Sequence, residues 1–145
     1  MENPFHRDNY ALMRHACYHQ HGKEVRIDEV NAQMCCENIR ELVRRTKQHK
    51  FVLHSSPEKR ATLTRDIVAE ELQRLGYEVS LPEPTAWLGP HSQSLTAQNL
   101  DLLINQEDDT FYLFIAHKPE IADFLGTEDN VVHCGIFMSK DQMIR

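Results

Sequence analysis

Residues 111–117 read FYLFIAH, a run of six apolar residues that ends in a histidine. An unbroken apolar run rich in aromatic and branched side chains is typical of a strand that is buried on both faces, as in a parallel sheet. A helical pattern follows as far as Leu125. The run therefore predicts a central strand over residues 111–116, with His117 at its carboxyl end.

Outward from this strand, apolar runs alternate with stretches of helical spacing. Ser56 and Pro57 suit the cap and the first position of a helix, and Gly76 suits its end. Residues 16–23 and 82–89 are polar and predict loops. The other predicted elements are strands over residues 10–13, 51–53, 77–81 and 131–138 and helices over residues 27–48, 57–75, 92–105 and 117–125.

Alternation of strands and helices predicts an α/β fold with a mainly parallel sheet covered by helices on both faces. This arrangement is a three-layer sandwich. The chain has 145 residues, about the size of one ordinary domain, and we expect a single domain over residues 1–145. With 41% hydrophobic and 26% charged residues, the composition is that of a folded globular protein.

The formal net charge of −6 disfavours nucleic acid as the main partner. No apolar run approaches the roughly 20 residues that cross a bilayer, and the start of the sequence lacks the apolar core of a secretory signal. We therefore expect no membrane partner and a cytoplasmic location. The sequence leaves the oligomeric state open.

The four cysteines are Cys17, Cys35, Cys36 and Cys134. Adjacent cysteines within a helical pattern make a poor disulfide framework, so we expect reduced thiols. Cys17 lies near His19 and His21, which are possible zinc ligands, but no second pair of ligands follows at a recognisable spacing. The sequence predicts no metal site and no cofactor.

Candidate functional residues follow three of the predicted strands. Arg14 and His15 come after the first strand, residues 55–60 after the second, and His117 after the central one. Ligands of open α/β sheets bind beyond the carboxyl ends of the strands. Arg60 falls in the first turn of a predicted helix, whose free amides also favour an anion. The sequence thus predicts a phosphate pocket within an acidic protein.

These residue types permit phosphoryl transfer. A neutral histidine can attack phosphorus and form a phosphohistidine, and His15 is the candidate nucleophile. Arg14, Arg60 and a protonated His117 would hold the phosphoryl oxygens and offset their charge. Glu83 is the nearest candidate for the acid that protonates a leaving group. Taken singly, each of these residues is more often a solvated loop or helix residue.

Three motifs together resemble the histidine phosphatase, or phosphoglycerate mutase-like, superfamily. LMRHA at residues 12–16 is similar to its Arg-His-Gly signature, HSSPEKRATLT at residues 54–64 to its second motif, and FIAHKPEIADFL at residues 114–125 to its final motif. The short chain, with no room for a cap over the site, resembles the phosphohistidine phosphatases of this superfamily.

The resemblance implies a phosphoglycerate mutase-like fold in which His15 becomes phosphorylated and Arg14, Arg60 and His117 bind phosphate. It implies a metal-independent phosphatase that acts on phosphohistidine in a protein or on a small phosphate ester. Mutase activity is a weaker option, because a cap is missing.

Three departures from the family pattern concern the site. Ala16 stands in place of the usual glycine, which adds a methyl group and disfavours a positive φ. Lys118 follows His117 where many members have a small residue. The segment LPEPTAWLG at residues 81–89 resembles the one that carries the family's glutamate, here Glu83. Ala16 motivates the alternative function, a phosphate- or phosphoprotein-binding module without turnover.

Overall fold

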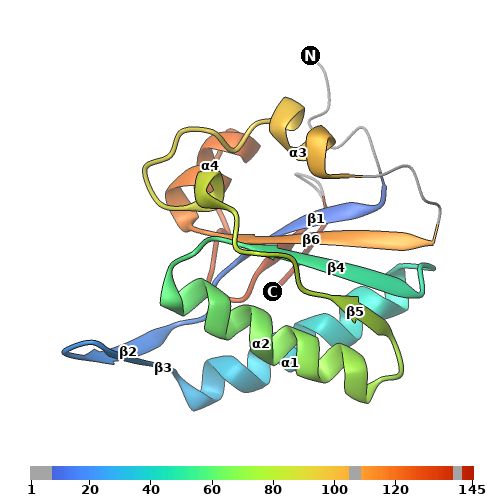
Figure 1. The fold of residues 1–145 in the computed structure, drawn as a ribbon, viewed down its shortest axis with the longest axis horizontal. Coiled ribbons are helices and arrows are strands. Elements are labelled where there is room, and N and C mark those ends of the chain that lie inside the picture. Colours follow the sequence, from blue (N-terminus) through green and yellow to red (C-terminus); the bar gives the residue numbers. More distant parts are fainter. Residues whose placement is uncertain (1–7, 105–108, 139–141) are drawn as a thin grey trace.

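The protein is described by a computed structural model that covers residues 8–104, 109–138 and 142–145. Its centre is a six-stranded sheet in the order β5-β4-β6-β1-β7-β8 (Figure 1). The strands of this sheet are β1 (Tyr10–Arg14), β4 (Lys50–Ser55), β5 (Glu78–Ser80), β6 (Thr110–Ala116), β7 (Ile136–Phe137) and β8 (Met143–Ile144).

The four strands β5, β4, β6 and β1 run parallel, as the sequence predicts. Every residue of β6 is buried, because this strand has a partner on each side and helices above and below. β7 pairs antiparallel with β1, and β8 pairs antiparallel with β7. The sheet is therefore mixed. The predicted site residues follow strands of its parallel part.

Helices cover both faces of the sheet, which confirms the predicted three-layer arrangement (Figure 1). The helices α1 (Glu29–Arg45) and α2 (Lys59–Arg74) lie on one face, and α3 (Ala97–Leu103) and α4 (Lys118–Leu125) on the other. Two apolar cores result. One contains Leu42 of α1 and Leu72 of α2, and the other contains Leu100 of α3 and Ile121 of α4.

The helix α1 matches its prediction closely. Its N-cap is Asp28, whose carboxylate accepts a hydrogen bond from the amide of Asn31. Glu29 in the first turn and two arginines in the last turn complement the helix dipole.

The predicted start of α2 is wrong by two residues. Glu58, not Ser56, is the N-cap, and Pro57 lies outside the helix. The hydroxyl of Ser56 accepts instead from the amide of Glu58 and contacts His117, so a tertiary contact takes the group that would have capped the helix. The end of α2 is as predicted, with Gly76 in the left-handed region at φ +94°.

Four further predictions are corrected. The predicted loop over residues 16–23 contains the strand β2 (Tyr18–His21), which forms a hairpin with β3 (Glu24–Ile27). This hairpin projects beyond the sheet (Figure 1). A short 3-10 helix, η1 (Ala86–Leu88), interrupts the loop over residues 82–89. The last predicted strand, over residues 131–138, reduces to β7, because residues 131–135 form no strand and include a turn at residues 133–134. The helix predicted over residues 92–105 is α3, which is shorter, and residue 105 lies outside the described residues.

All four cysteines are free thiols. In the part of the chain that the structure describes, no helix combines the length and apolar character that crossing a bilayer requires. Over the same residues, no group of three or more metal-ligating side chains is placed to hold an ion.

Candidate active site

Neighbouring parallel strands bring the predicted site residues together. Arg14 at the end of β1 lies opposite Ala116 at the end of β6, and the amide of His15 donates to the Ala116 carbonyl at 3.1 Å. The rings of His15 and His117 consequently lie 5.1 Å apart between their centres. A hollow of about 300 Å³ opens here. Its lining residues are Arg14, His15, Tyr18, Arg60, Pro90, His91, His117, Lys118, Pro119 and His133.

His15 is held in one tautomer. Its Nδ1 lies 2.8 Å from the carbonyl oxygen of Ala16, and because a carbonyl can only accept, Nδ1 carries the proton. The other ring nitrogen, Nε2, therefore keeps its lone pair. Burial lowers the pKa of His15 to about 4, with smaller contributions from the nearby charge of Arg60. At neutral pH the ring is an uncharged base, as a nucleophile at phosphorus needs to be.

Arg14 is anchored by the turn that precedes β7. Its Nη1 donates to the carbonyl of Val131 at 2.9 Å, and its Nη2 lies 3.2 Å from Nε2 of His133. The Nδ1 of His133 lies 3.1 Å from the carbonyl oxygen of His15, to which it can only donate. The Nε2 of a neutral His133 is then the acceptor for Arg14. One imidazole thus ties Arg14 to the backbone of His15.

His117 is the N-cap residue of α4 and is 3% exposed. Its Nε2 lies 2.8 Å from the hydroxyl of Ser56, which fixes the plane of the ring. Burial, followed by the nearby His15 and Arg60, lowers the pKa of His117 to about 3. His117 is therefore uncharged at neutral pH, in contrast to the protonated ring that the sequence predicts. A phosphoryl dianion beside it would favour the protonated form.

Arg60 occupies the second position of α2 and points toward the hairpin. Its guanidinium carbon lies 5.5 Å from the centre of the Tyr18 ring, a cation–π geometry. Its Nη1 lies 3.6 Å from a carboxylate oxygen of Glu58. Both contacts leave Arg60 at the rim of the hollow, beside the amino terminus of a 16-residue helix whose dipole attracts anions.

Glu83 is not brought to this hollow. It is exposed between two prolines and is absent from the lining, while the amide of the nearby Thr85 donates to the carbonyl of Ser55 at 2.7 Å. None of the described residues that line the hollow carries a carboxyl group. A role for Glu83 as the acid stays a prediction.

The backbone at Ala16 does not require glycine. Ala16 is not among the residues with positive φ. Its amide donates to the hydroxyl of Thr64 at 2.9 Å, and its methyl group is fully buried in the core beneath the site. The alanine therefore adopts an ordinary conformation and does not enter the hollow.

Sequence reasoning missed three ring residues of the site. Tyr18 lies in the stretch that was predicted to be a loop, and His133 in the stretch predicted to be a strand. His91 lies between the predicted loop over residues 82–89 and the predicted helix over residues 92–105. A local signal exists only for His133, since the segment HCG at residues 133–135 places a polar residue and a glycine just before β7.

No family model matches the sequence, and no curated protein matches it either. Solved structures do resemble the chain. The protein histidine phosphatase SixA, solved in complex with tungstate, superposes with a TM-score of 0.67 at 15% identity, over 93% of this chain and 95% of that one. A putative phosphohistidine phosphatase SixA from Agrobacterium tumefaciens has a TM-score of 0.52 at 15% identity, over 79% of this chain and 71% of that one.

Phosphoserine phosphatase from Entamoeba histolytica, in complex with 3-phosphoglyceric acid, has a TM-score of 0.50 at 17% identity, over 88% of this chain and 87% of that one. The fold is therefore that of the histidine phosphatases, the phosphoglycerate mutase-like class that the three motifs resemble. The SixA structure solved with tungstate matches over nearly the full length of both chains.

Proposed function

We propose that this protein is a phosphatase that works through a phosphohistidine at His15. The observation that carries the proposal is the hollow lined by His15, His117, Arg14 and Arg60, with the two imidazole ring centres 5.1 Å apart. A nucleophile with a free lone pair and two cations for the phosphoryl oxygens are what a displacement at phosphorus requires. The SixA structure that holds tungstate, a tetrahedral oxyanion, supports a phosphoryl site in this fold.

The substrate we infer is phosphohistidine in a protein. A phosphorus–nitrogen bond has a good leaving group, because the departing imidazole takes up a proton near neutral pH and needs no strong acid. An alkyl phosphate ester loses an alkoxide, which does need one. The lack of a carboxyl group among the described lining residues therefore favours phosphohistidine.

The reaction has two steps. In the first, Nε2 of His15 forms a bond to phosphorus while the bond from phosphorus to the substrate imidazole breaks, and that imidazole takes a proton from water. In the second, a water oxygen forms a bond to phosphorus while the bond to His15 breaks, and inorganic phosphate and a proton are released. Arg14, Arg60 and His117 hold the phosphoryl oxygens in both steps.

The binding module without turnover has lost its main support. It rested on Ala16, and the alanine neither strains the backbone nor enters the hollow. We retain it as the outcome that the following experiment distinguishes.

The test is release of phosphate from a phosphohistidine peptide, an aryl phosphate and an alkyl phosphate, in the presence of a metal chelator. We expect turnover of the first two, and slower turnover of the alkyl ester by at least about a hundredfold, the usual contribution of a general acid. His15→Ala should lose at least about a thousandfold and fail to form an acid-labile phosphoprotein. His19→Ala, the same change on the exposed hairpin, is the control.

Equal phosphate release by wild type and His15→Ala would reject the nucleophile. Saturable binding of the phosphopeptide with no release and no phosphoprotein would favour the binding module.

A further inference from the structure

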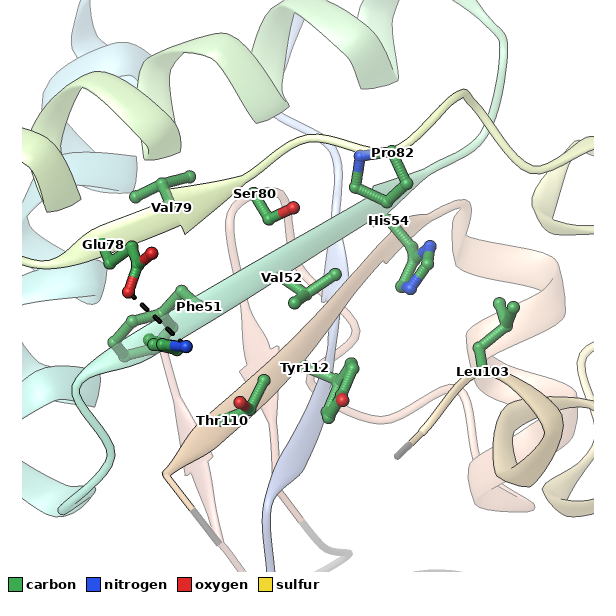
Figure 2. A pocket seen from close by; sticks show the side chains of 11 residues that line it. Phe51, Val52, His54, Glu78, Val79, Ser80, Pro82, Leu103, Thr110 and Tyr112 are labelled. Atoms are coloured by element: carbon green, nitrogen blue, oxygen red, sulfur yellow. Dashed lines mark ion pairs between the residues drawn. The ribbon is translucent and has the colours of Figure 1, made fainter. Parts of the chain in front are cut away.

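A second hollow lies on the sheet, away from the phosphate site. It has a volume of about 490 Å³ and shares no lining residue with the first hollow. Figure 2 shows its floor, which is formed by strands β4, β5 and β6, with Pro82 and Leu103 on its walls. We call it the sheet groove. Its lining residues are Lys50, Phe51, Val52, His54, Glu78, Val79, Ser80, Pro82, Leu103, Thr110 and Tyr112.

The size of the sheet groove suits a small ligand. Ligand pockets commonly measure about 300–1,000 Å³ and combine an apolar lining with a few polar groups. Val52 of β4 and Ser80 of β5 lie on the floor of the groove. The helix α2 also packs against both of these strands. Val52 is partly buried and Ser80 is exposed.

The strand register separates a charged end from an aromatic end. Lys50 lies opposite Glu78 on β5, and their Nζ and Oε2 atoms are 3.8 Å apart. The two side chains are 49% and 68% exposed, so the ion pair is weak. The charged groups of a ligand can therefore replace either partner. His54 lies four residues further along β4, about 13 Å from Lys50 at the usual rise of a strand.

His54 at the aromatic end has unused hydrogen-bonding capacity. It is 7% exposed, and its Nδ1 is buried with no hydrogen-bond partner among the described residues. The ring stacks beside Phe114 and Tyr112, with ring centres 5.2 and 6.4 Å away. Burial lowers the pKa of His54 to about 4, so the ring is neutral. Figure 2 shows it at the same end of the groove as Leu103.

We propose that the sheet groove binds a small zwitterion with an aromatic ring that carries a hydrogen-bond donor, the class of the free hydroxyaromatic amino acids. The ring would lie between His54, Tyr112 and Leu103, with its donor on Nε2 of His54, the ring nitrogen that is not sealed from solvent. The ammonium group would face Glu78, and the carboxylate would face Lys50. Each end of such a ligand meets a complementary group. Binding of this ligand does not depend on the proposed phosphatase activity.

The test uses L-tyrosine and the full chain, followed by amide NMR shifts. We expect saturable shifts confined to β4, β5 and β6. Lys50→Glu should weaken the apparent affinity about tenfold, because it sets a second negative charge against the carboxylate. Lys47→Glu makes the same charge change on an exposed residue outside the groove, and it should change affinity less than twofold.

One further ligand and one variant test the aromatic end. L-phenylalanine lacks the donor and should bind about fivefold more weakly, the usual effect of one hydrogen bond. His54→Phe keeps the stacked ring and should remove this preference. Thermal unfolding checks that each variant is folded.

Absence of saturable shifts in L-tyrosine solutions up to its solubility limit would overturn the proposal. Equal weakening by Lys50→Glu and Lys47→Glu would overturn it as well.

Discussion

Backbone carbonyl oxygens select the tautomers of two histidines of the site. The carbonyl of Ala16 fixes the proton of His15 on Nδ1, and the carbonyl of His15 fixes the proton of His133 in the same way. Backbone acceptors cannot donate, so each contact selects a tautomer without adding a charge. The lone pair of His15 is thereby left for the proposed attack on phosphorus, and that of His133 accepts from Arg14.

His133 is a positioning residue on this view. We expect His133→Ala to reduce kcat/KM about 10- to 100-fold, because Arg14 loses an acceptor and the turn loses its hold on the carbonyl of His15. Steady-state kinetics, together with affinity for inorganic phosphate, measure the effect.

His133→Asn offers a shorter side chain with a donor and an acceptor, and it should recover part of the loss. An unchanged phosphate affinity in His133→Ala would show that Arg14 does not depend on this ring.

The contact between α1 and α2 centres on one carboxylate. Glu71 of α2 accepts from Arg40 of α1 at 3.0 Å and from Arg74 at 2.8 and 2.6 Å. Its side chain is 7% exposed, and the hydrogen bonds from Arg74 lower its pKa. Because the folded-state pKa is lowered, this stabilisation is present at neutral pH and is lost as the pH falls through that pKa.

Glu71→Gln removes the charge and weakens these charge-assisted hydrogen bonds. We expect the free energy of unfolding to fall by about 1–2 kcal/mol at pH 7, measured by urea denaturation. Glu70→Gln, the same change on the neighbouring exposed residue, should have little effect. Equal losses in the two variants would contradict the assigned role.

The turn before β7 depends on Gly135. A Cβ atom there would lie 3.0 Å from the carbonyl oxygen of Val132 and 3.0 Å from the ring of Phe137. We expect Gly135→Ala to lower the free energy of unfolding by about 1–3 kcal/mol, as overpacked sites do, and to lower activity because His133 moves with the turn. An unchanged melting temperature and unchanged activity would show that the turn accommodates the added methyl group without strain.

Three buried neutral histidines make the whole molecule sensitive to acid. The folded-state pKa values are about 4 for His15, about 4 for His54 and about 3 for His117. Below the ordinary value of about 6.5, the unfolded chain binds protons that the folded chain does not, so stability falls as the pH drops from about 6.5 toward 4. Above pH 6.5 these groups no longer oppose folding.

We expect the free energy of unfolding to decrease by about 1 kcal/mol for each of these histidines between pH 7.5 and pH 5.5. Urea denaturation at the two pH values measures the total. His54→Phe should remove about a third of the decrease, since it deletes one of the three groups. A free energy that stays constant over this range would contradict the burial of neutral rings.

Much of the fold was accessible from local patterns. The apolar run of β6 and the helical spacing of α1 predict their elements because burial on both faces, or on one stripe, imposes a period on the sequence. Parallel strands then bring their carboxyl ends to one edge, so the meeting of Arg14, His15, Arg60 and His117 could be anticipated.

Tertiary contacts decided the rest. The Cys134 backbone is at φ +66° and its amide donates to the carbonyl of Arg14, so the turn that carries His133 is set by a strand more than a hundred residues away in the sequence. Ser56 contacts His117 and does not cap α2. The sequence alone determined which residues could bind phosphate. Only the packed structure decided which of them share the hollow, because long-range contacts carry no periodic signal along the chain.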